Sequence, residues 1–224
     1  MGSPGSVLDL DHQVVSLKLR LEVLGRSQQS ALRRVAPLVQ RRGFYLAGGT
    51  GLALQLGHRR SVDVDWFRLQ PIEDPLRLAA AMHADGLALR IDRVEEGTLH
   101  ARVGEVRFSF FEYRYPLLKP ALEAQGLTLA ALEDVAAMKL AAVAQRGSKK
   151  DFVDIYALGR RYGLREMLDL YRRKYGVADV GHVLVALAYF DDADRERMPT
   201  LLRRRWDWST MKATIRRWVA DTAG

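Results

Sequence analysis

The segment FYLAGGTGLALQLGHRRSVDVDWF, residues 44–67, carries the pattern that decides the fold. Its apolar run Phe44–Ala47 predicts a short strand, which Gly48 and Gly49 end in a turn. The spacing of apolar residues in Thr50–Leu56 predicts a helix. In Ser61–Leu69, successive residues fall alternately on the two sides of an extended chain, which predicts a second strand. A strand, a glycine turn, a helix and another strand therefore follow one another within this segment.

The sequence on both sides of this segment adds further helices and strands. Apolar residues recur at helical spacing from Leu8 to Arg42, and Pro71–Ala84 predicts a helix with Pro75 near its first turn. Glycine turns then separate three strands, which predicts an antiparallel meander over residues 87–94, 98–103 and 106–113. Beyond Pro116 every segment predicts helix: residues 132–145, 149–162, 164–174 and 180–189, then two basic segments to the end.

These elements predict an α+β fold with two lobes. We expect residues 1–115 to form an α+β lobe around a mixed β-sheet, and residues 116–224 to form a helical lobe. The joint lies within Tyr115–Leu129, and residues 1–8 are expected to be flexible. No internal repeat or low-complexity tract is present, which excludes solenoid and disordered architectures.

The composition limits the chemistry of the chain. A length of 224 residues suits one domain or two closely packed lobes. The absence of cysteine excludes disulfides, thiolate zinc sites and a cysteine nucleophile, and it fits the cytoplasm, where we expect the protein. No apolar run approaches the ~20 residues of a membrane span, and the sequence has no signal-peptide pattern, so we expect no membrane partner.

The net charge of +8 is concentrated in the second half of the chain. Residues 1–112 carry 15 basic and 13 acidic side chains, whereas residues 113–224 carry 20 and 14. This excess favours a polyanionic partner, although arginine-rich helices are also common where genomic composition favours arginine codons. In the same half, the segment Arg203–Trp208 interleaves arginines with tryptophans, which could stack on RNA bases or pack inward.

Two motifs within residues 44–67 have the residue types of a phosphate and metal site. Gly48-Gly49-Thr50 places two glycines at a helix N-terminus, an arrangement that binds phosphate but is also common as a simple tight turn. Asp63 and Asp65 lie two residues apart on a predicted strand, so both carboxylates project from one face. Such a pair can hold Mg²⁺ together with substrate phosphates.

A third cluster of charged residues lies on two successive predicted helices. Its members are Lys139, Arg146, Lys149, Lys150, Asp151 and Asp154. A catalytic role requires this cluster to meet the aspartate pair across the two lobes. Alternatively, Ser148 and Asp151 form a capping pair at a helix start. Asp154 can also pair locally, with Arg146 or with Lys150.

Together, these motifs resemble those of the AbiEii toxin family, which belongs to the polymerase-β-like nucleotidyltransferase superfamily. Residues 44–67 resemble the family's signature, and MKLAAVAQRGSKKDFVDIYAL, residues 138–158, is similar to its downstream motif. Val106–Phe111 is similar to the strand on which the superfamily usually places a third carboxylate, but this chain has Ser109 there. The resemblance is specific over Phe44–Leu158 and fainter beyond it.

The resemblance implies a nucleotidyltransferase fold, and transfer of a nucleoside monophosphate from a nucleoside triphosphate to an acceptor, dependent on Mg²⁺ or Mn²⁺. It implies catalytic roles for Asp63, Asp65, Lys139 and Asp151, and of these Asp63 and Asp65 would bind the metal. The nucleotide would be bound by Gly48, Gly49, Thr50 and Lys150. Supporting roles are implied for Ser61, Ser109, Arg146 and Asp154. Family members act as toxins of toxin–antitoxin or phage-defence pairs, some with tRNA as acceptor. An RNA acceptor and a cognate antitoxin are therefore expected. The alternative is a non-catalytic member that binds nucleotide, RNA or a partner protein, because Ser109 leaves the carboxylate triad incomplete.

Overall fold

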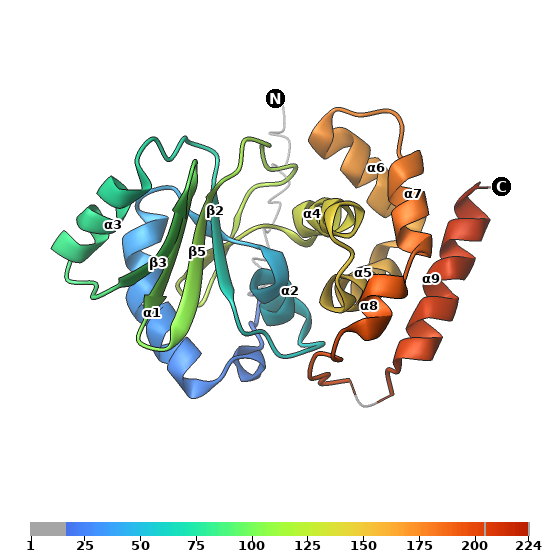
Figure 1. The fold of residues 1–224 in the computed structure, drawn as a ribbon, viewed down its shortest axis with the longest axis horizontal. Helices are drawn as coiled ribbons and strands as arrows, with labels where there is room; N and C mark the ends of the chain where they lie inside the picture. Colours follow the sequence, from blue (N-terminus) through green and yellow to red (C-terminus); the bar gives the residue numbers. More distant parts are fainter. Residues whose placement is uncertain (1–16, 204, 224) are drawn as a thin grey trace, which may run out of the picture.

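The computed structural model describes residues 17–203 and 205–223, and a seven-stranded mixed sheet organises the part up to Leu129 (Figure 1). The order across the sheet is β3-β4-β5-β2-β1-β7-β6. Its strands are β1 Tyr45–Leu46, β2 Val64–Arg68, β3 Arg90–Glu95, β4 Thr98–Val103, β5 Val106–Glu112, β6 Leu122–Ala124 and β7 Leu127–Leu129. The predicted antiparallel meander is β3-β4-β5, whereas β2 runs parallel to β5 and antiparallel to β1. The α+β fold with a mixed sheet is therefore confirmed.

Three helices precede or interrupt these strands: α1 Arg26–Gln40, α2 Gly48–Leu56 and α3 Pro75–Ala84. The helical spacing of apolar residues from Leu8 to Arg42 corresponds to a helix only from Arg26 to Gln40, because a short 3-10 turn at Leu21–Val23 precedes α1. Gly25 stands before α1 in an extended conformation, and its N–H donates to the Gln28 side chain at 2.8 Å. Residues 8–16 of that prediction, like the leader at residues 1–8, lie outside the described part.

The two faces of the sheet differ in burial. On β2, Val64 and Trp66 are fully buried, and they join a core with residues of α1 and α3. Asp65 and Phe67 project from the opposite face and are half-buried. Because side chains alternate along a strand, one face is packed by α1 and α3, and the other is open near α2.

The second half contains the helices α4 Leu132–Gln145, α5 Lys149–Tyr162, α6 Leu164–Tyr175, α7 Gly181–Ala188, α8 Asp191–Arg195 and α9 Trp208–Ala223. They gather on the far side of α2 from the sheet (Figure 1). Leu52 of α2 and Ala47 before it pack into the core of these helices, while Leu54 packs into the sheet core. The helix α2 thus lies where the two cores meet.

The expectation that every segment beyond Pro116 is helical is wrong for residues 122–129. These residues form the hairpin β6-β7, which turns at Gln125 and Gly126, both with positive φ. The hairpin joins the sheet because Leu129 of β7 pairs in parallel with Leu46 of β1. Strands of three residues are too short for periodicity to reveal them. The division into lobes at 115/116 remains a prediction.

A non-helical segment between α8 and α9, residues 197–203, returns to the sheet side. The N–H of Arg60 donates to the Thr200 carbonyl at 2.8 Å, and the N–H of Leu202 donates to the His58 carbonyl at 2.9 Å. We call residues 197–203 the strap. After the strap, Trp206 and Trp208 pack against Tyr156 and Phe152, with ring centroids 4.9 and 6.0 Å apart, which favours their inward packing. Within the described residues, no helix is both long and apolar enough to span a membrane.

Candidate active site

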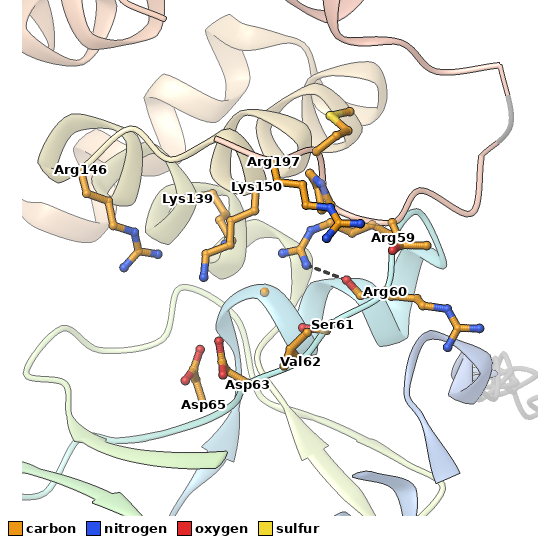
Figure 2. Close-up of a pocket in the computed structure, with 14 residues that line it drawn as sticks. Arg59, Arg60, Ser61, Val62, Asp63, Asp65, Lys139, Arg146, Lys150 and Arg197 are labelled. Atoms are coloured by element: carbon orange, nitrogen blue, oxygen red, sulfur yellow. Dashed lines mark hydrogen bonds between the residues drawn. The ribbon is translucent and has the colours of Figure 1, made fainter. Parts of the chain in front are cut away.

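A cleft of about 420 Å³ lies where α2, β2, α4, α5 and the strap converge (Figure 2). Asp63 and Asp65 line one wall. Lys139, Arg146 and Lys150 line the opposite wall and point toward the two carboxylates in Figure 2. The structure thus brings the two predicted charge clusters together, and we call this hollow the cationic cleft.

At the start of α2, Gly49 lines the cationic cleft and Gly48 lies beside Asp65. A Cβ at Gly48 would lie 3.3 Å from Oδ2 of Asp65, and a Cβ at Gly49 would lie 2.7 Å from Nη2 of Arg59. Gly48 also has a φ of +61°, which side-chain-bearing residues rarely adopt. Ala47 precedes the helix and supplies no side-chain cap, so the first N–H groups of α2 are left for an anion.

Thr50, expected to bind triphosphate, is fully buried. Its hydroxyl lies 2.7 Å from Oγ of Ser61 and donates to the backbone carbonyl of Asp63. Ser61 is also buried but reaches the wall of the cationic cleft. Thr50 therefore fixes the backbone that carries Asp63 and does not line the cleft, whereas Ser61 both contacts Thr50 and lines the cleft.

The aspartate pair is electrostatically strained. Burial raises the pKa of Asp65, and the negative charge of Asp63 raises it further. Asp63 itself accepts a hydrogen bond from Nε of Arg107 on β5 at 2.8 Å. A cation beside Asp65 would relieve the repulsion, which is what a metal-binding carboxylate requires.

Ser109 is the direct register neighbour of Asp65 on β5. Its hydroxyl lies 3.0 Å from Nδ1 of His100, the next residue across the sheet on β4. Among the described residues, no group of three or more His, Cys, Asp or Glu side chains is arranged to hold a metal. A pair of carboxylates nevertheless suits Mg²⁺, which is commonly held by one or two carboxylates together with substrate phosphates.

Behind the cationic wall, a buried ion-pair network joins the two halves of the chain. Asp154, fully buried on α5, accepts hydrogen bonds from Nε and Nη2 of Arg59 at 2.7 and 2.8 Å and contacts Nε2 of His58 at 2.7 Å. Nζ of Lys139 lies 2.6 Å from Oδ2 of Asp154 and 2.9 Å from Oδ1 of Asp151. Two carboxylates therefore hold Lys139 between them at the edge of the cleft.

The network keeps its members ionised. Burial by itself would raise the pKa of Asp151, but Lys139 and Arg146 reverse this and hold the pKa below its usual range. Burial opposes ionisation of Asp154 in the same way, and Arg59 and Lys139 keep its pKa well below normal. Burial would lower the pKa of Lys139, but the negative charges of Asp154 and Asp151 have the larger effect and raise it. Burial lowers the pKa of His58, so the imidazole is neutral.

Of the local pairings suggested by the sequence, Ser148 and Asp151 do pair, though without a capping bond, whereas the pairings suggested for Asp154 are wrong. Ser148 stands at the N-cap of α5 but makes no capping hydrogen bond. Its hydroxyl instead donates to Asp151 at 2.6 Å. Asp154 contacts Arg59 rather than Arg146 or Lys150. Asp151 is fully buried behind the cationic wall, so it orients Lys139 and Arg146 instead of facing Asp63 and Asp65.

Three arginines that the sequence did not single out line the cationic cleft: Arg59, Arg60 and Arg197. Arg59 also donates to the carbonyl of Arg60 at 3.0 Å (Figure 2). Arg59 and Arg60 immediately precede Ser61, so a basic pair beside the aspartate motif was the available signal. Arg197 comes from the strap, and its sequence position gives no indication of its place in the cleft.

Comparisons with known proteins identify the family and support the fold. The profile of the family described as nucleotidyl transferase AbiEii toxin, type IV toxin–antitoxin system, matches residues 30–221. An uncharacterized protein of Aquifex aeolicus (strain VF5) is 40% identical over 179 residues, which cover 77% of this chain and 86% of that protein.

Two solved structures share the fold at low sequence identity. JHP933 from Helicobacter pylori superposes with a TM-score of 0.54 at 16% identity, over 88% of this chain and 92% of that one. MenT4, a nucleotidyltransferase toxin from Mycobacterium tuberculosis, superposes with a TM-score of 0.52 at 18% identity, over 86% and 81% of the two chains. Since the family profile covers most of the sequence, this chain belongs to the AbiEii family of nucleotidyltransferase toxins.

Proposed function

We propose that the protein transfers a nucleoside monophosphate from a nucleoside triphosphate to an RNA acceptor, such as tRNA, with the help of a divalent metal ion. The observation that carries this proposal is the aspartate pair facing the cationic wall across the cleft. Asp63 and Asp65 provide negative charge, Lys139, Arg146 and Lys150 provide positive charge, and glycine backbone lies between them. Transfer of a phosphoryl group needs this combination.

Asp63 and Asp65 would hold Mg²⁺ or Mn²⁺. The raised pKa of Asp65 supports this assignment, because Lys139, Lys150 and Arg146 offset only part of the effect of burial and of the charge of Asp63. When bound, the metal supplies positive charge to the phosphate oxygens and aligns them for attack. Since Ser109 supplies only a neutral oxygen beside Asp65, we expect weak metal binding that strengthens once a triphosphate adds its own oxygens.

The other residues of the cleft would hold the triphosphate. The N–H groups at the start of α2 and the side chains of Lys139, Arg146 and Lys150 neutralise its charge. An acceptor hydroxyl forms the new bond to the α-phosphorus while the bond to the bridging oxygen breaks. Pyrophosphate leaves with that oxygen, and the hydroxyl proton passes to solvent. Residues that fix the attacking geometry contribute most of the rate in such a site.

The partners follow from charge and family. The excess of basic side chains in residues 113–224 supports an RNA acceptor, whose phosphates they would neutralise. Membership of a type IV toxin–antitoxin family supports a toxin role, balanced by a cognate antitoxin in the cytoplasm.

The test is incubation of the protein with each radiolabelled triphosphate, Mg²⁺ and total tRNA, followed by electrophoresis of the RNA. Asp63→Ala should abolish label transfer. Asp192→Ala is the matched control, because Asp192 belongs to another Asp-x-Asp pair, is exposed on α8 and lines neither wall. Unchanged transfer by Asp63→Ala would refute the proposed metal site. If the wild type transfers no label to any RNA, the non-catalytic binding function replaces this proposal.

A further inference from the structure

A second hollow, of about 540 Å³, continues the cationic cleft on the other side of Asp65. It shares Gly49, Asp65, Lys139 and Arg146 with the cationic cleft, so the two hollows meet at the proposed reaction centre. Its remaining wall is rich in aromatic rings, contributed by Phe67, Phe111, Tyr113, Tyr115, Tyr171 and Tyr175. We call this hollow the aromatic pocket.

The rings come from both sides of the molecule. Phe67 of β2 and Phe111 of β5 are stacked, with centroids 5.1 Å apart and an interplanar angle of 27°. Tyr175 of α6 meets Tyr115 edge to face at 4.7 Å, and its hydroxyl lies 2.6 Å from that of Tyr113. The sheet and the helices thus present flat apolar surfaces to one cavity.

The polar lining of the aromatic pocket consists of neutral groups, the charged residues shared with the cationic cleft, and one carboxylate, Glu112. Burial raises the pKa of Tyr175 to about 12, so its hydroxyl remains protonated and can donate or accept hydrogen bonds. Glu112, which also lines the pocket, accepts from Nε of Arg114 at 2.6 Å and from the N–H of Ile72 at 3.0 Å. The pocket therefore suits a flat neutral ligand with hydrogen-bonding edges, rather than an anion.

In the sheet core, the rings of Trp66 and Phe110 are completely buried. Here, by contrast, Phe67, Phe111 and Tyr113 are half-buried, and Tyr115 is 43% exposed. Partly exposed rings around an open cavity leave π faces free for a ligand. Since Asp65, Lys139 and Arg146 lie at the mouth, a ligand with a phosphate at the reaction centre would extend its other end among these rings.

We propose that the aromatic pocket binds a nucleobase by stacking, while the cationic cleft holds the phosphates. This inference rests on the proposed nucleotidyl transfer. Stacking on aromatic rings accepts every base, because each base has a π face. The base comes either from the triphosphate or from the unpaired end of the RNA acceptor, and the experiment below distinguishes these two sources.

The test measures binding rather than transfer. Phe111→Leu and Tyr115→Leu each keep apolar bulk but remove a ring, and Tyr115 is exposed enough to be replaced without loss of folding. Tyr189→Leu is the matched control, because Tyr189 is 53% exposed and lines neither hollow. Calorimetry with Mg²⁺ uses three probes: a non-hydrolysable nucleoside triphosphate, inorganic tripolyphosphate and a single-stranded tetraribonucleotide. Thermal unfolding checks that each variant is folded.

If the triphosphate supplies the base, the ring variants should bind the nucleoside triphosphate about tenfold more weakly and tripolyphosphate unchanged. If the acceptor supplies it, only the tetraribonucleotide should bind about tenfold more weakly. The proposal is overturned if no probe binds the wild type, if both ring variants bind all three probes like the control, or if tripolyphosphate binding falls as much as the others. Ring-dependent binding in a protein that transfers no label would uphold the pocket and refute the proposed reaction.

Discussion

Replacing Asp154 by asparagine tests the buried network most directly. Asp154 accepts from Nε and Nη2 of Arg59, contacts Nε2 of His58 and lies 2.6 Å from Nζ of Lys139. Asparagine keeps one acceptor oxygen but turns an NH₂ group toward these cations. Lys139 would keep Asp151 at 2.9 Å, whereas Arg59 would keep only the carbonyl of Arg60 at 3.0 Å. The variant thus leaves one buried guanidinium without a carboxylate.

Removing one partner of a buried ion pair costs about 3–5 kcal/mol of unfolding free energy, because the remaining charge stays desolvated. For a chain of this size, each kcal/mol lowers Tm by roughly 2–4 °C, so the expected decrease in Tm is roughly 6–20 °C. The effect should also depend on pH. The pKa of Asp154 lies well below that of an unfolded aspartate. Its stabilisation is therefore fully present above about pH 4 and is lost as the pH falls through the lower pKa of the folded state.

Urea unfolding at pH 7, and again at a series of lower pH values, measures both effects. Asp169→Asn is the control, because Asp169 makes an exposed i,i+3 pair with Arg172 at 2.7 Å and should contribute less than about 1 kcal/mol. The stability of Asp154→Asn should decline less steeply in acid than that of the wild type. A loss at pH 7 no larger than that of Asp169→Asn would refute the view that Asp154 holds the network together.

Three further substitutions probe the cleft itself. Gly49→Ala should lower the free energy of unfolding in urea by about 1–3 kcal/mol and reduce transfer, because the added methyl group would lie only 2.7 Å from Nη2 of Arg59 and must displace that side chain. Wild-type stability and wild-type transfer would contradict this packing. Asp65→Asn should raise Tm in the absence of metal, because the raised pKa of Asp65 shows that its negative charge destabilises the fold, and it should abolish transfer. A lower Tm would contradict the view that this charge is destabilising. Ser109→Asp should tighten Mg²⁺ binding by calorimetry and leave transfer intact or raised, and tight Mg²⁺ binding by the wild type without nucleotide would overturn this expectation.

Much of the fold is predictable because its signals are local. The alternation in Ser61–Leu69, the glycines of the meander and the long periodic stretches of α4 to α6 each predict the element that forms. The hairpin at residues 122–129 is not predicted, because its strands depend on pairing with β1 rather than on their own periodicity. Apolar spacing does not mark the beginning of α1, because the contact between Gly25 and Gln28 that precedes it involves polar atoms.

The residue types of the site were predictable from the sequence, but the contacts between their side chains were not. Asp63, Asp65 and Lys139 line one cleft. The partners of Asp154, however, come from 95 and 96 residues away, at Arg59 and His58. Sequence spacing suggests neighbours on the same helix, so it pointed to Arg146 and Lys150 instead. Long-range ion pairs depend on tertiary packing, which no local pattern encodes.

The distribution of charge around the cleft explains why such a site can be built before substrate arrives. Asp151 and Asp154 fix Lys139 in place, and Asp154 ties Arg59 to α5, so the cationic wall is held by ion pairs buried behind it. For Asp65, on the opposite wall, burial and the charge of Asp63 outweigh the positive charges of Lys139, Lys150 and Arg146, and its pKa is raised. Lys139 and Arg59 are thus neutralised by carboxylates behind the wall, whereas Asp65 remains next to the like charge of Asp63. Because oriented charges need not reorganise during reaction, this asymmetry favours transfer over mere binding. We therefore expect a metal ion and a triphosphate to bind cooperatively in the cleft, because the metal offsets the aspartate charge and the triphosphate supplies it with further oxygen ligands.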